Sequence, residues 1–224
     1  MPADRIHDLR QALTAVADPV EAPAMAAYMK DRFEFLGVAA PARRSAQRPY
    51  VAAGRTARSG ELLDGADICW SQPEREFQYV GTDLLRRWVA SIDATDLSRV
   101  EALIRTKPWW DTVDALAANV VGPMVAATPS LVDVMDRWID DELWVARSAI
   151  LHQLRYRDRT DVDRLFGYVD RRCGDTDFFM RKAAGWALRE YSKTDPDAIR
   201  RYVADRGDEL SGLTRREALK RIGP

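Results

Sequence analysis

The sequence predicts an all-α protein made of stacked helix pairs. Apolar residues recur at helical spacing along almost the whole chain, and the alternating pattern of a half-buried strand is hard to find. From about residue 75 onward the expected helices come in pairs, each pair spanning about 40 residues. Stacked pairs of this size bury a continuous core and leave a concave surface, which is the usual binding side of such arrays.

These observations favour a single domain over residues 1–224. The pair length is that of a HEAT-like repeat. We therefore expect HEAT-like helical repeats stacked into a curved α-α superhelix, or solenoid. The pairing is inferred from the order of the elements, because similarity in sequence between the pairs is weak.

The individual helices are marked by apolar stripes and by their first residues. The stripes run through residues 77–88, 97–104 and 162–169, with apolar side chains three or four positions apart. Aspartate or proline is favoured at helix starts, and such residues stand, in chain order, at Pro41, Asp96, Asp161 and Asp195-Pro196. Roughly a dozen helices of about 8–16 residues follow from this pattern.

Composition narrows the possible functions. The formal net charge is −1, so the whole molecule is not a polycation, although a local basic face can still attract nucleic acid. Arginine makes up 29 of the 34 basic residues; this suits phosphate contacts, but a GC-rich genome is the simpler cause. Cys69 and Cys173 form no CxxC pattern and are expected to be reduced thiols. With only two histidines, no metal site is expected.

The beginning of the chain indicates where the protein works. The segment MPADRIHDLRQAL is charged throughout, and no apolar run approaches the length that spans a membrane. We therefore expect a cytoplasmic protein.

The stretch TKPWWDTVD combines two tryptophans with two aspartates in one expected helix, 109–121. On a helical wheel Trp110 and Asp114 are four residues apart and lie together, away from the core stripe. Asp111 lies further round, toward solvent. The pair could form a functional site beside the core. It could also be an exposed aromatic residue next to a solvated acid, because single exposed apolar residues are normal. The core stripe holds Trp109, Val113, Leu116 and Val120.

Arg147 lies in the middle of an apolar stripe of the helix expected over 143–156. A buried arginine is costly unless it is paired. It could extend its charged end to solvent, or it could pair with a carboxylate from an adjacent helix. The preceding helix pair offers Asp114 as that partner.

A third unusual residue is Trp186, in the helix expected over 178–191. It lies opposite the apolar face, with Lys182 four residues before it and Arg189 three residues after it. Gly185 beside it permits a close approach, so this surface suits contact with a nucleic-acid backbone. Residues 145–193 carry 11 Lys/Arg against 7 Asp/Glu, whereas residues 61–100 carry 4 against 8.

With these residues in hand, the sequence resembles the AlkD-type DNA alkylation repair proteins, which are alkylpurine DNA glycosylases built from HEAT-like repeats. WWDTVD and GWALREY, in that order and near that separation, are the specific signals. Ala39 and Ala40 depart from the family pattern, which often has polar residues there. The resemblance covers YMKDRFEFLGV (28–38), PEREFQ (73–78), KPWWDTVD (107–114), ARSAILHQLRY (146–156), KAAGWALREYSKT (182–194) and LTRREALKRI (213–222).

The resemblance implies a catalytic set and a reaction. Trp110 and Asp114 line the lesion site, Trp186 is the other aromatic residue, and Arg147 packs beside the aspartate. The implied reaction is hydrolysis of the N-glycosidic bond of cationic N3- or N7-alkylated purines in duplex DNA, such as 3-methyladenine and 7-methylguanine. This is the first step of base excision repair, and family members act without fully flipping the lesion into a pocket, unlike most glycosylases.

The chemistry of such a substrate explains why few groups suffice. An alkylated purine already carries positive charge, so it departs neutral and needs no general acid. A fixed carboxylate, Asp114, can stabilise the oxocarbenium-like sugar and orient a water, with Arg147 favouring its ionised form. Trp110 and Trp186 would hold the cationic sugar and base. No cofactor is expected, and Lys182 is a better phosphate contact than a Schiff-base nucleophile.

The expected partner is double-stranded DNA that contains alkylated purines, bound at the concave face by a monomer that associates with the nucleoid. Two other functions stay open. One is a non-catalytic HEAT-repeat module that binds damaged or distorted DNA, and the other is a protein–protein scaffold. The residues expected to bind DNA are Tyr28, Arg43, Arg44, Arg155, Lys182 and Arg189.

Overall fold

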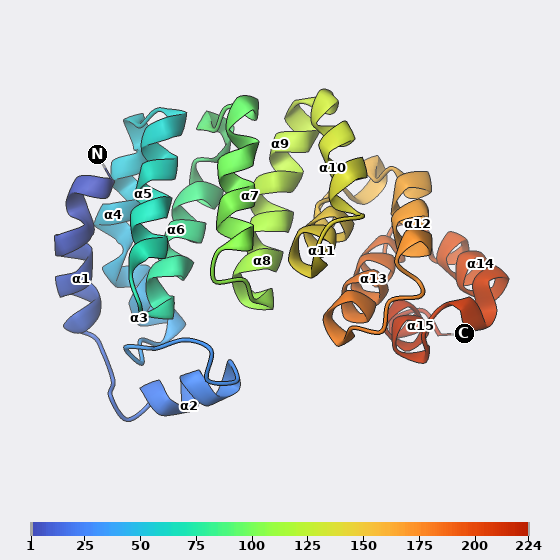
Figure 1. Ribbon diagram of the computed structural model, residues 1–224, viewed down its shortest axis with the longest axis horizontal. Coiled ribbons are helices and arrows are strands. Elements are labelled where there is room, and N and C mark those ends of the chain that lie inside the picture. Colours follow the sequence, from blue (N-terminus) through green and yellow to red (C-terminus); the bar gives the residue numbers. More distant parts are fainter. Residues whose placement is uncertain (1, 224) are drawn as a thin grey trace. The chain divides into compact units, whose positions relative to one another are not determined.

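The computed structural model describes residues 2–223 and confirms the all-α prediction (Figure 1). Within these residues, extended pairing is limited to one isolated bridge between Glu34 and Glu74. Contacts divide the chain into two compact units, Met1–Lys107 and Pro108–Pro224, called here unit 1 and unit 2. The expectation of one domain over 1–224 stays a prediction.

Unit 1 is a bundle in which α5 and α6 pack side by side and α4 packs against α6 (Figure 1). Three of its helices, α2, α3 and α4, are only five to seven residues long, shorter than the sequence predicts. Its helices are α1 (Ile6–Thr14), α2 (Ala22–Tyr28), α3 (Ala40–Ala46), α4 (Arg48–Ala52), α5 (Ser59–Ser71), α6 (Arg75–Arg87) and α7 (Leu97–Arg105).

Two charged residues at the start of α6 hold the loops of unit 1. The Glu76 carboxylate is fully buried and accepts hydrogen bonds from the backbone N–H groups of Leu36, Gly37 and Val38, at 3.0–3.1 Å. The fully buried Arg75 donates to the Lys107 carbonyl at 2.9 Å. A buried charge is tolerated when it is hydrogen-bonded in this way. The segments FLGV and PEREFQ are therefore held together by the hydrogen bonds of Glu76, which stabilise the fold of unit 1.

Unit 2 contains the stacked pairs that the sequence predicts. The pairs are α10 with α11, α12 with α13, and α14 with α15, while α8, α11, α13 and α15 contact one another in succession. This arrangement confirms helical-repeat stacking within the unit. Its helices are α8 (Trp110–Leu116), α9 (Gly122–Ala127), α10 (Val132–Trp138), α11 (Leu143–Leu151), α12 (Val162–Arg171), α13 (Phe178–Tyr191), α14 (Pro196–Arg206) and α15 (Gly212–Leu219).

Aspartate side chains cap three of these helices. Asp161 accepts from the Arg164 N–H, Asp177 from the N–H groups at the start of α13, and Asp195 from the Ala198 N–H. Each carboxylate satisfies a backbone donor that has no partner inside the helix. The helix starts predicted at Asp161 and Asp195 are confirmed.

The expected single helix over 109–121 is wrong in one respect. The α-helix begins at Trp110, and residues Ala117–Val121 form a π-helical turn before α9 begins at Gly122. A Cβ at Gly122 would lie 2.2 Å from the His152 carbonyl oxygen, so only glycine permits this approach to the end of α11. π-Helical turns of this kind occur frequently at functional sites.

The structure also bears on the two cysteines and on membrane-spanning segments. Cys69 and Cys173 are both free, and the buried Cys69 thiol donates to the Tyr50 hydroxyl. Among residues 2–223, no helix is both long enough and apolar enough to cross a membrane.

Candidate active site

An ion pair between Asp114 and Arg147 joins α8 to α11. The Arg147 guanidinium donates from Nε to Asp114 Oδ1 at 2.6 Å and from Nη2 to Asp114 Oδ2 at 2.7 Å. Such bidentate pairs fix orientation and are the strong form of this contact. Arg147 is 4% exposed, so its charged end does not extend into solvent. Pairing with a carboxylate, the other alternative, explains its position in the apolar stripe.

The environment acts on the pKa of Asp114 in opposing directions. Burial raises the pKa of the Asp114 carboxyl, the hydrogen bonds and charge of Arg147 lower it, and the neighbouring Asp111 raises it. The balance is a pKa above the ordinary value of an aspartate. Arg147 thus favours the charged form, as expected, but the loss of solvent outweighs it.

The third contact of Arg147 is with the backbone of Phe179, whose ring belongs to an aromatic cluster. Arg147 Nη1 donates to the Phe179 carbonyl oxygen. The rings of Trp109, Trp144 and Phe179 lie within 4.9–5.6 Å of one another, centroid to centroid. Trp109 is 7% exposed, as the wheel predicts for a core residue. These contacts fix Arg147, and through it Asp114, on three helices of unit 2.

Asp114 opens into a pocket of about 620 Å³ within unit 2. Trp110 and Trp186, both half-buried, line it together with Asp114, so the structure brings three of the four predicted catalytic residues to one pocket. Arg147 lies behind the carboxylate, not in the lining. The pocket thus combines a carboxylate with two indole rings, which suits a cationic group.

Four polar residues of the same pocket were not predicted as site residues. They are Asp111, Asn119, Arg157 and Glu190. Asp111 follows the helical spacing of Trp110 and Asp114, and the wheel had directed it to solvent. Asn119 lies in the π-helical turn, which a regular wheel does not describe. Arg157 begins the 3₁₀ turn Arg157–Arg159, and Glu190 lies at the end of α13, so no local pattern identifies either residue.

Lys182 and Arg189 do not stand free on the surface of α13. Lys182 Nζ donates to Glu217 Oε1 at 2.8 Å, and Arg189 Nη1 donates to Glu217 Oε2. These two cations lower the pKa of Glu217. The close approach that Gly185 permits is likewise made to α15, because a Cβ there would lie 2.5 Å from Glu217 Cβ. The interpretation of Gly185 as an opening for DNA is therefore wrong, and the segment RREALKR packs as a helix of the array.

We predict that Gly185→Ala destabilises unit 2 by about 1–3 kcal/mol, because overfilling a tight contact forces α15 to shift. Chemical unfolding followed by circular dichroism measures this change. Gly167→Ala in α12 is the matched control, since no atom lies within 4 Å of its added Cβ. Alanine should stabilise that helix by about 0.5–1 kcal/mol. Equal effects at the two glycines would contradict the packing argument.

The remaining predicted DNA-binding residues lie in different surroundings. Tyr28 is 69% exposed and Arg44 and Arg155 are exposed, with Arg155 at the edge of the pocket that contains Asp114. Arg43 is buried, donates to Asp83 Oδ2 at 3.3 Å and lies over the Tyr79 ring. Its guanidinium is thus engaged inside unit 1, because residue 43 faces α6 while residue 44 faces solvent.

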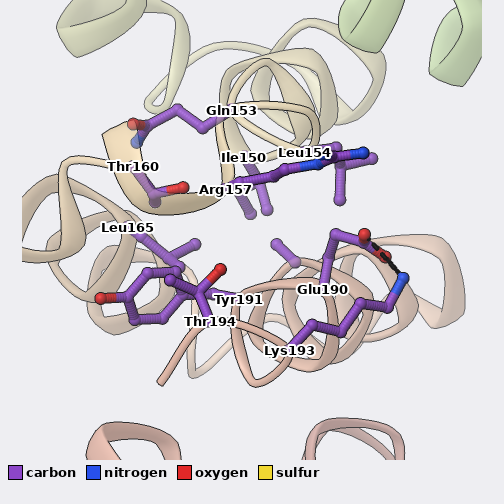
Figure 2. Close-up of a pocket in the computed structure, with 11 residues that line it drawn as sticks. Ile150, Gln153, Leu154, Arg157, Thr160, Leu165, Glu190, Tyr191, Lys193 and Thr194 are labelled. Atoms are coloured by element: carbon purple, nitrogen blue, oxygen red, sulfur yellow. Dashed lines mark hydrogen bonds and ion pairs between the residues drawn. The ribbon is translucent and has the colours of Figure 1, made fainter. Parts of the chain in front are cut away.

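A smaller pocket of about 340 Å³ adjoins the first one (Figure 2). The two share Leu154, Arg157 and Glu190 in their linings. In Figure 2 the Arg157 side chain runs along one wall, and Glu190 meets Lys193 on the opposite side. Arg157 has a backbone φ of 55°, a left-handed conformation that is uncommon outside glycine. The wall between the two pockets therefore includes a backbone position that the surrounding structure must hold.

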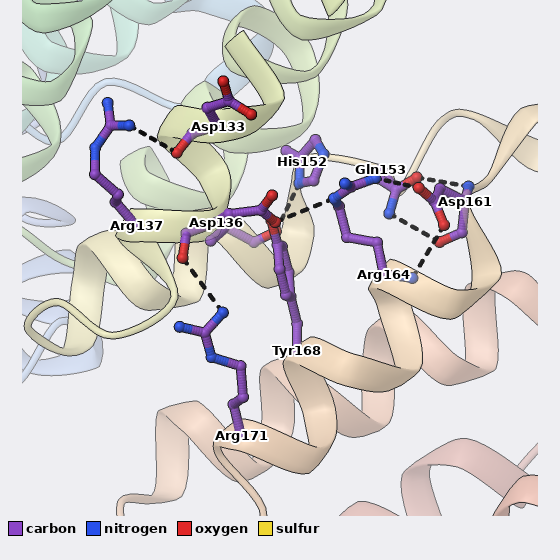
Figure 3. Close-up of polar contacts among 10 residues, drawn as sticks. Asp133, Asp136, Arg137, His152, Gln153, Asp161, Arg164, Tyr168 and Arg171 are labelled. Carbon is purple, nitrogen blue, oxygen red and sulfur yellow. Dashed lines mark hydrogen bonds and ion pairs between the residues drawn. The ribbon is translucent and has the colours of Figure 1, made fainter. Parts of the chain in front are cut away.

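A separate polar cluster between α10 and α12 supports the fold (Figure 3). Tyr168 donates to Asp136 Oδ1 at 2.6 Å, and Arg164 donates to the same oxygen at 3.2 Å. His152 is 1% exposed and bonds to the Ala149 carbonyl through Nδ1, and burial lowers its pKa to about 4. This histidine is neutral at physiological pH and lies in the core.

Metal ligands do not gather at the site. Over residues 2–223, no three His, Cys, Asp or Glu side chains are grouped so as to hold a metal ion. The polar chemistry of the pocket comes from carboxylates, guanidinium groups, an amide and two indole rings.

Comparison with known proteins agrees with the fold. The family described as DNA alkylation repair enzyme matches residues 9–222. A solved structure described as a predicted DNA alkylation repair enzyme from Enterococcus faecalis has a TM-score of 0.85 and 30% sequence identity, covering 92% of this chain and 96% of that one. No curated protein matches the chain. The fold and these matches define a helical-repeat protein of DNA repair. The chain belongs to the DNA alkylation repair enzyme family.

Proposed function

We propose that the protein is a monofunctional DNA glycosylase that hydrolyses the N-glycosidic bond of cationic N3- or N7-alkylated purines in duplex DNA. One observation carries this proposal: a carboxylate, Asp114, is fixed by a buried arginine in the wall of an open pocket that Trp110 and Trp186 also line. A surface that only binds phosphate has no use for a fixed carboxylate, since it would repel the backbone.

The proposed reaction needs no proton for the leaving group. The C1′–N bond breaks and its electron pair neutralises the positive charge of the alkylated base, which leaves as a neutral purine. Positive charge then develops on the sugar, and a preorganised carboxylate stabilises it. Each Asp114 oxygen accepts one hydrogen bond from Arg147 and keeps another lone pair. A water bound there adds its oxygen to C1′ and loses its proton to solvent, which gives an abasic site.

The two tryptophans act on the same charge. An indole face attracts a cation within about 6 Å of its centre, so Trp110 and Trp186 would bind the charged base and sugar more strongly than their neutral counterparts. This preference supports the cationic N3- and N7-alkylpurines as substrates over uncharged lesions. The position of both rings in one pocket with Asp114 is the structural basis for this step.

Hydrolysis is favoured over a Schiff-base route. Lys182 is absent from the pocket lining, and its ammonium is bonded to Glu217. An ion-paired ammonium is not the neutral amine that attacks a sugar carbon. The proposal therefore includes release of the base without cleavage of the DNA strand by the protein.

The test is base release by the purified full chain from a duplex oligonucleotide with a single 7-methylguanine. The expected products are free 7-methylguanine and an abasic site that breaks only on later treatment with alkali. The same duplex without protein and an undamaged duplex with protein are the controls. Binding of the damaged duplex without release would overturn the glycosylase proposal in favour of a damage-binding module. Neither release nor binding would favour the protein–protein scaffold.

A further inference from the structure

Unit 1 contains a second basic surface that no motif of the sequence analysis identified as a whole. A groove of about 560 Å³ lies between α3, α4, the turn Ala53–Thr56 and the end of α6. Its lining includes four arginines and no acidic residue. We call it the arginine groove, and it is lined by Arg44, Gln47, Arg48, Val51, Ala52, Arg55, Arg87 and Trp88.

The four guanidinium groups of the groove keep their charge unneutralised. Arg44, Arg48, Arg55 and Arg87 are all exposed, and none of them forms an ion pair with a carboxylate of the described chain. The acid nearest in sequence to Arg87, Asp83, accepts hydrogen bonds from Arg43 and Gln47 instead. Burial lowers the pKa of Arg43, Asp83 raises it, and the like charge of the neighbouring Arg44 adds a smaller lowering effect.

This grouping of four unpaired arginines around one groove contrasts with the basic segment 145–193 of unit 2. In the basic segment 145–193, Arg147, Lys182, Arg189 and Lys193 each contact a carboxylate. Seven of the eleven cations in that segment are thus paired with a carboxylate within the fold. In the arginine groove the charges remain available, although residues 61–100 of the same unit are acidic overall.

One wall of the groove is fixed in position. The Arg87 guanidinium carbon lies 4.5 Å from the centre of the Trp88 ring, and Trp88 Nε1 donates to the Val51 carbonyl at 2.7 Å. A guanidinium stacked on an aromatic face loses less freedom when it binds, and its planar donors match the oxygens of a phosphate. The groove thus combines charge, donors and a rigid support for an anion.

We propose that the arginine groove binds the phosphodiester backbone of duplex DNA and anchors the substrate without reading its sequence. This inference rests on the DNA-binding part of the proposed function. It assigns phosphate contacts to Arg48, Arg55 and Arg87 in addition to Arg44. The groove contributes affinity, and the pocket with Asp114 carries out the chemistry.

The experiment measures the affinity of the full chain for an undamaged duplex as the salt concentration is varied. Arg48→Gln/Arg55→Gln/Arg87→Gln removes three charges of the groove. The control Arg99→Gln/Arg105→Gln/Arg171→Gln removes three charges that are paired with Asp64 and Asp67, Glu101, and Asp140. Both variants change the net charge equally, so any difference in their affinity for DNA is due to where the removed charges lie. Arg48→Gln/Arg55→Gln leaves the Arg87–Trp88 contact intact, in case the triple groove variant folds poorly.

Each neutralised phosphate contributes about 0.9 to the slope of log affinity against log salt. The groove triple variant should therefore lower the magnitude of that slope by about 2–3, and the double variant by about 2, whereas the control should lower it by less than about 1. Equal slopes for the groove and control variants would overturn the proposal. If the wild type releases no base, the glycosylase proposal fails while the difference in slope still tests the groove.

Discussion

Asp114→Asn is expected to lower the rate of 7-methylguanine release by about 10²–10³-fold, the usual effect of removing one preorganised group that stabilises transition-state charge. The amide has nearly the same shape but carries no negative charge, so it cannot stabilise the developing cation on the sugar. Affinity for the damaged duplex should change little, because a carboxylate does not attract the backbone. Single-turnover release at saturating protein measures the effect on the chemical step.

Asp111→Asn is the matched control for this variant. Asp111 lies in the same pocket, three residues before Asp114, but it is not held by Arg147. Its Oδ1 accepts from the Thr112 N–H, a contact that an amide oxygen can keep. We expect release by Asp111→Asn to stay within about tenfold of the wild type, well short of the loss at Asp114. A similar loss in both variants would point to the general charge of the pocket and away from a specific role of Asp114.

Arg147→Met is expected to lower the free energy of unfolding by about 3–5 kcal/mol, because it leaves a buried carboxylate without its partner. The second variant Asp114→Asn/Arg147→Met removes both charges and should recover much of that loss. Urea unfolding of the wild type, the two single variants and the double variant gives the coupling between the residues. No recovery in the double variant would mean that Arg147 acts mainly through its bond to the Phe179 carbonyl.

The destabilisation by Arg147→Met should also depend on pH. Arg147 lowers the pKa of Asp114, so its removal raises that pKa further above the ordinary value. A carboxyl with a raised pKa in the folded state binds its proton more tightly than in the unfolded chain. Its contribution to stability is therefore present at low pH and is lost as pH rises through the folded-state pKa. The difference in unfolding free energy between variant and wild type should shrink as pH falls.

The same shift should appear in catalysis. If the carboxylate form of Asp114 is the active one, the acidic limb of the pH–rate profile lies at its pKa. That limb should move to higher pH in Arg147→Met, with activity partly restored under alkaline conditions. An unchanged limb in a folded variant would separate Arg147 from the ionisation of Asp114 and leave it a purely structural role.

Local patterns predicted the central features of the candidate site. The spacing of Trp110 and Asp114 on one helix, and the position of Arg147 in an apolar stripe, follow from periodicity and from the cost of burying a charge. The pairing of Asp114 with Arg147 could be proposed because a buried arginine needs a carboxylate partner, and the preceding helix pair offers Asp114. The structure contains that contact.

Other features could not be predicted, because they depend on residues far apart in the chain. Lys182 and Arg189 have the pattern of a basic surface, and only the packing of α15 on α13 brings Glu217 to them. Arg43 and Arg44 are neighbours in one motif, yet one is buried on Asp83 and the other lines a groove. The spacing of residues along one helix does not show whether such a cation is exposed or paired, because that depends on which acidic residue another helix brings near.

By itself, the sequence determined the all-α class, the helix pairs and the positions of Trp110, Asp114 and Arg147 in the candidate site, because helical periodicity and the burial of apolar stripes are local properties of the chain. Only the tertiary structure decided the electrostatics. The pKa of Asp114 depends on how deeply three helices bury it, and the charge of the arginine groove depends on which carboxylates packing has taken elsewhere. Both are sums over contacts between distant segments, and charge interactions depend on separation and solvent exposure rather than on sequence order.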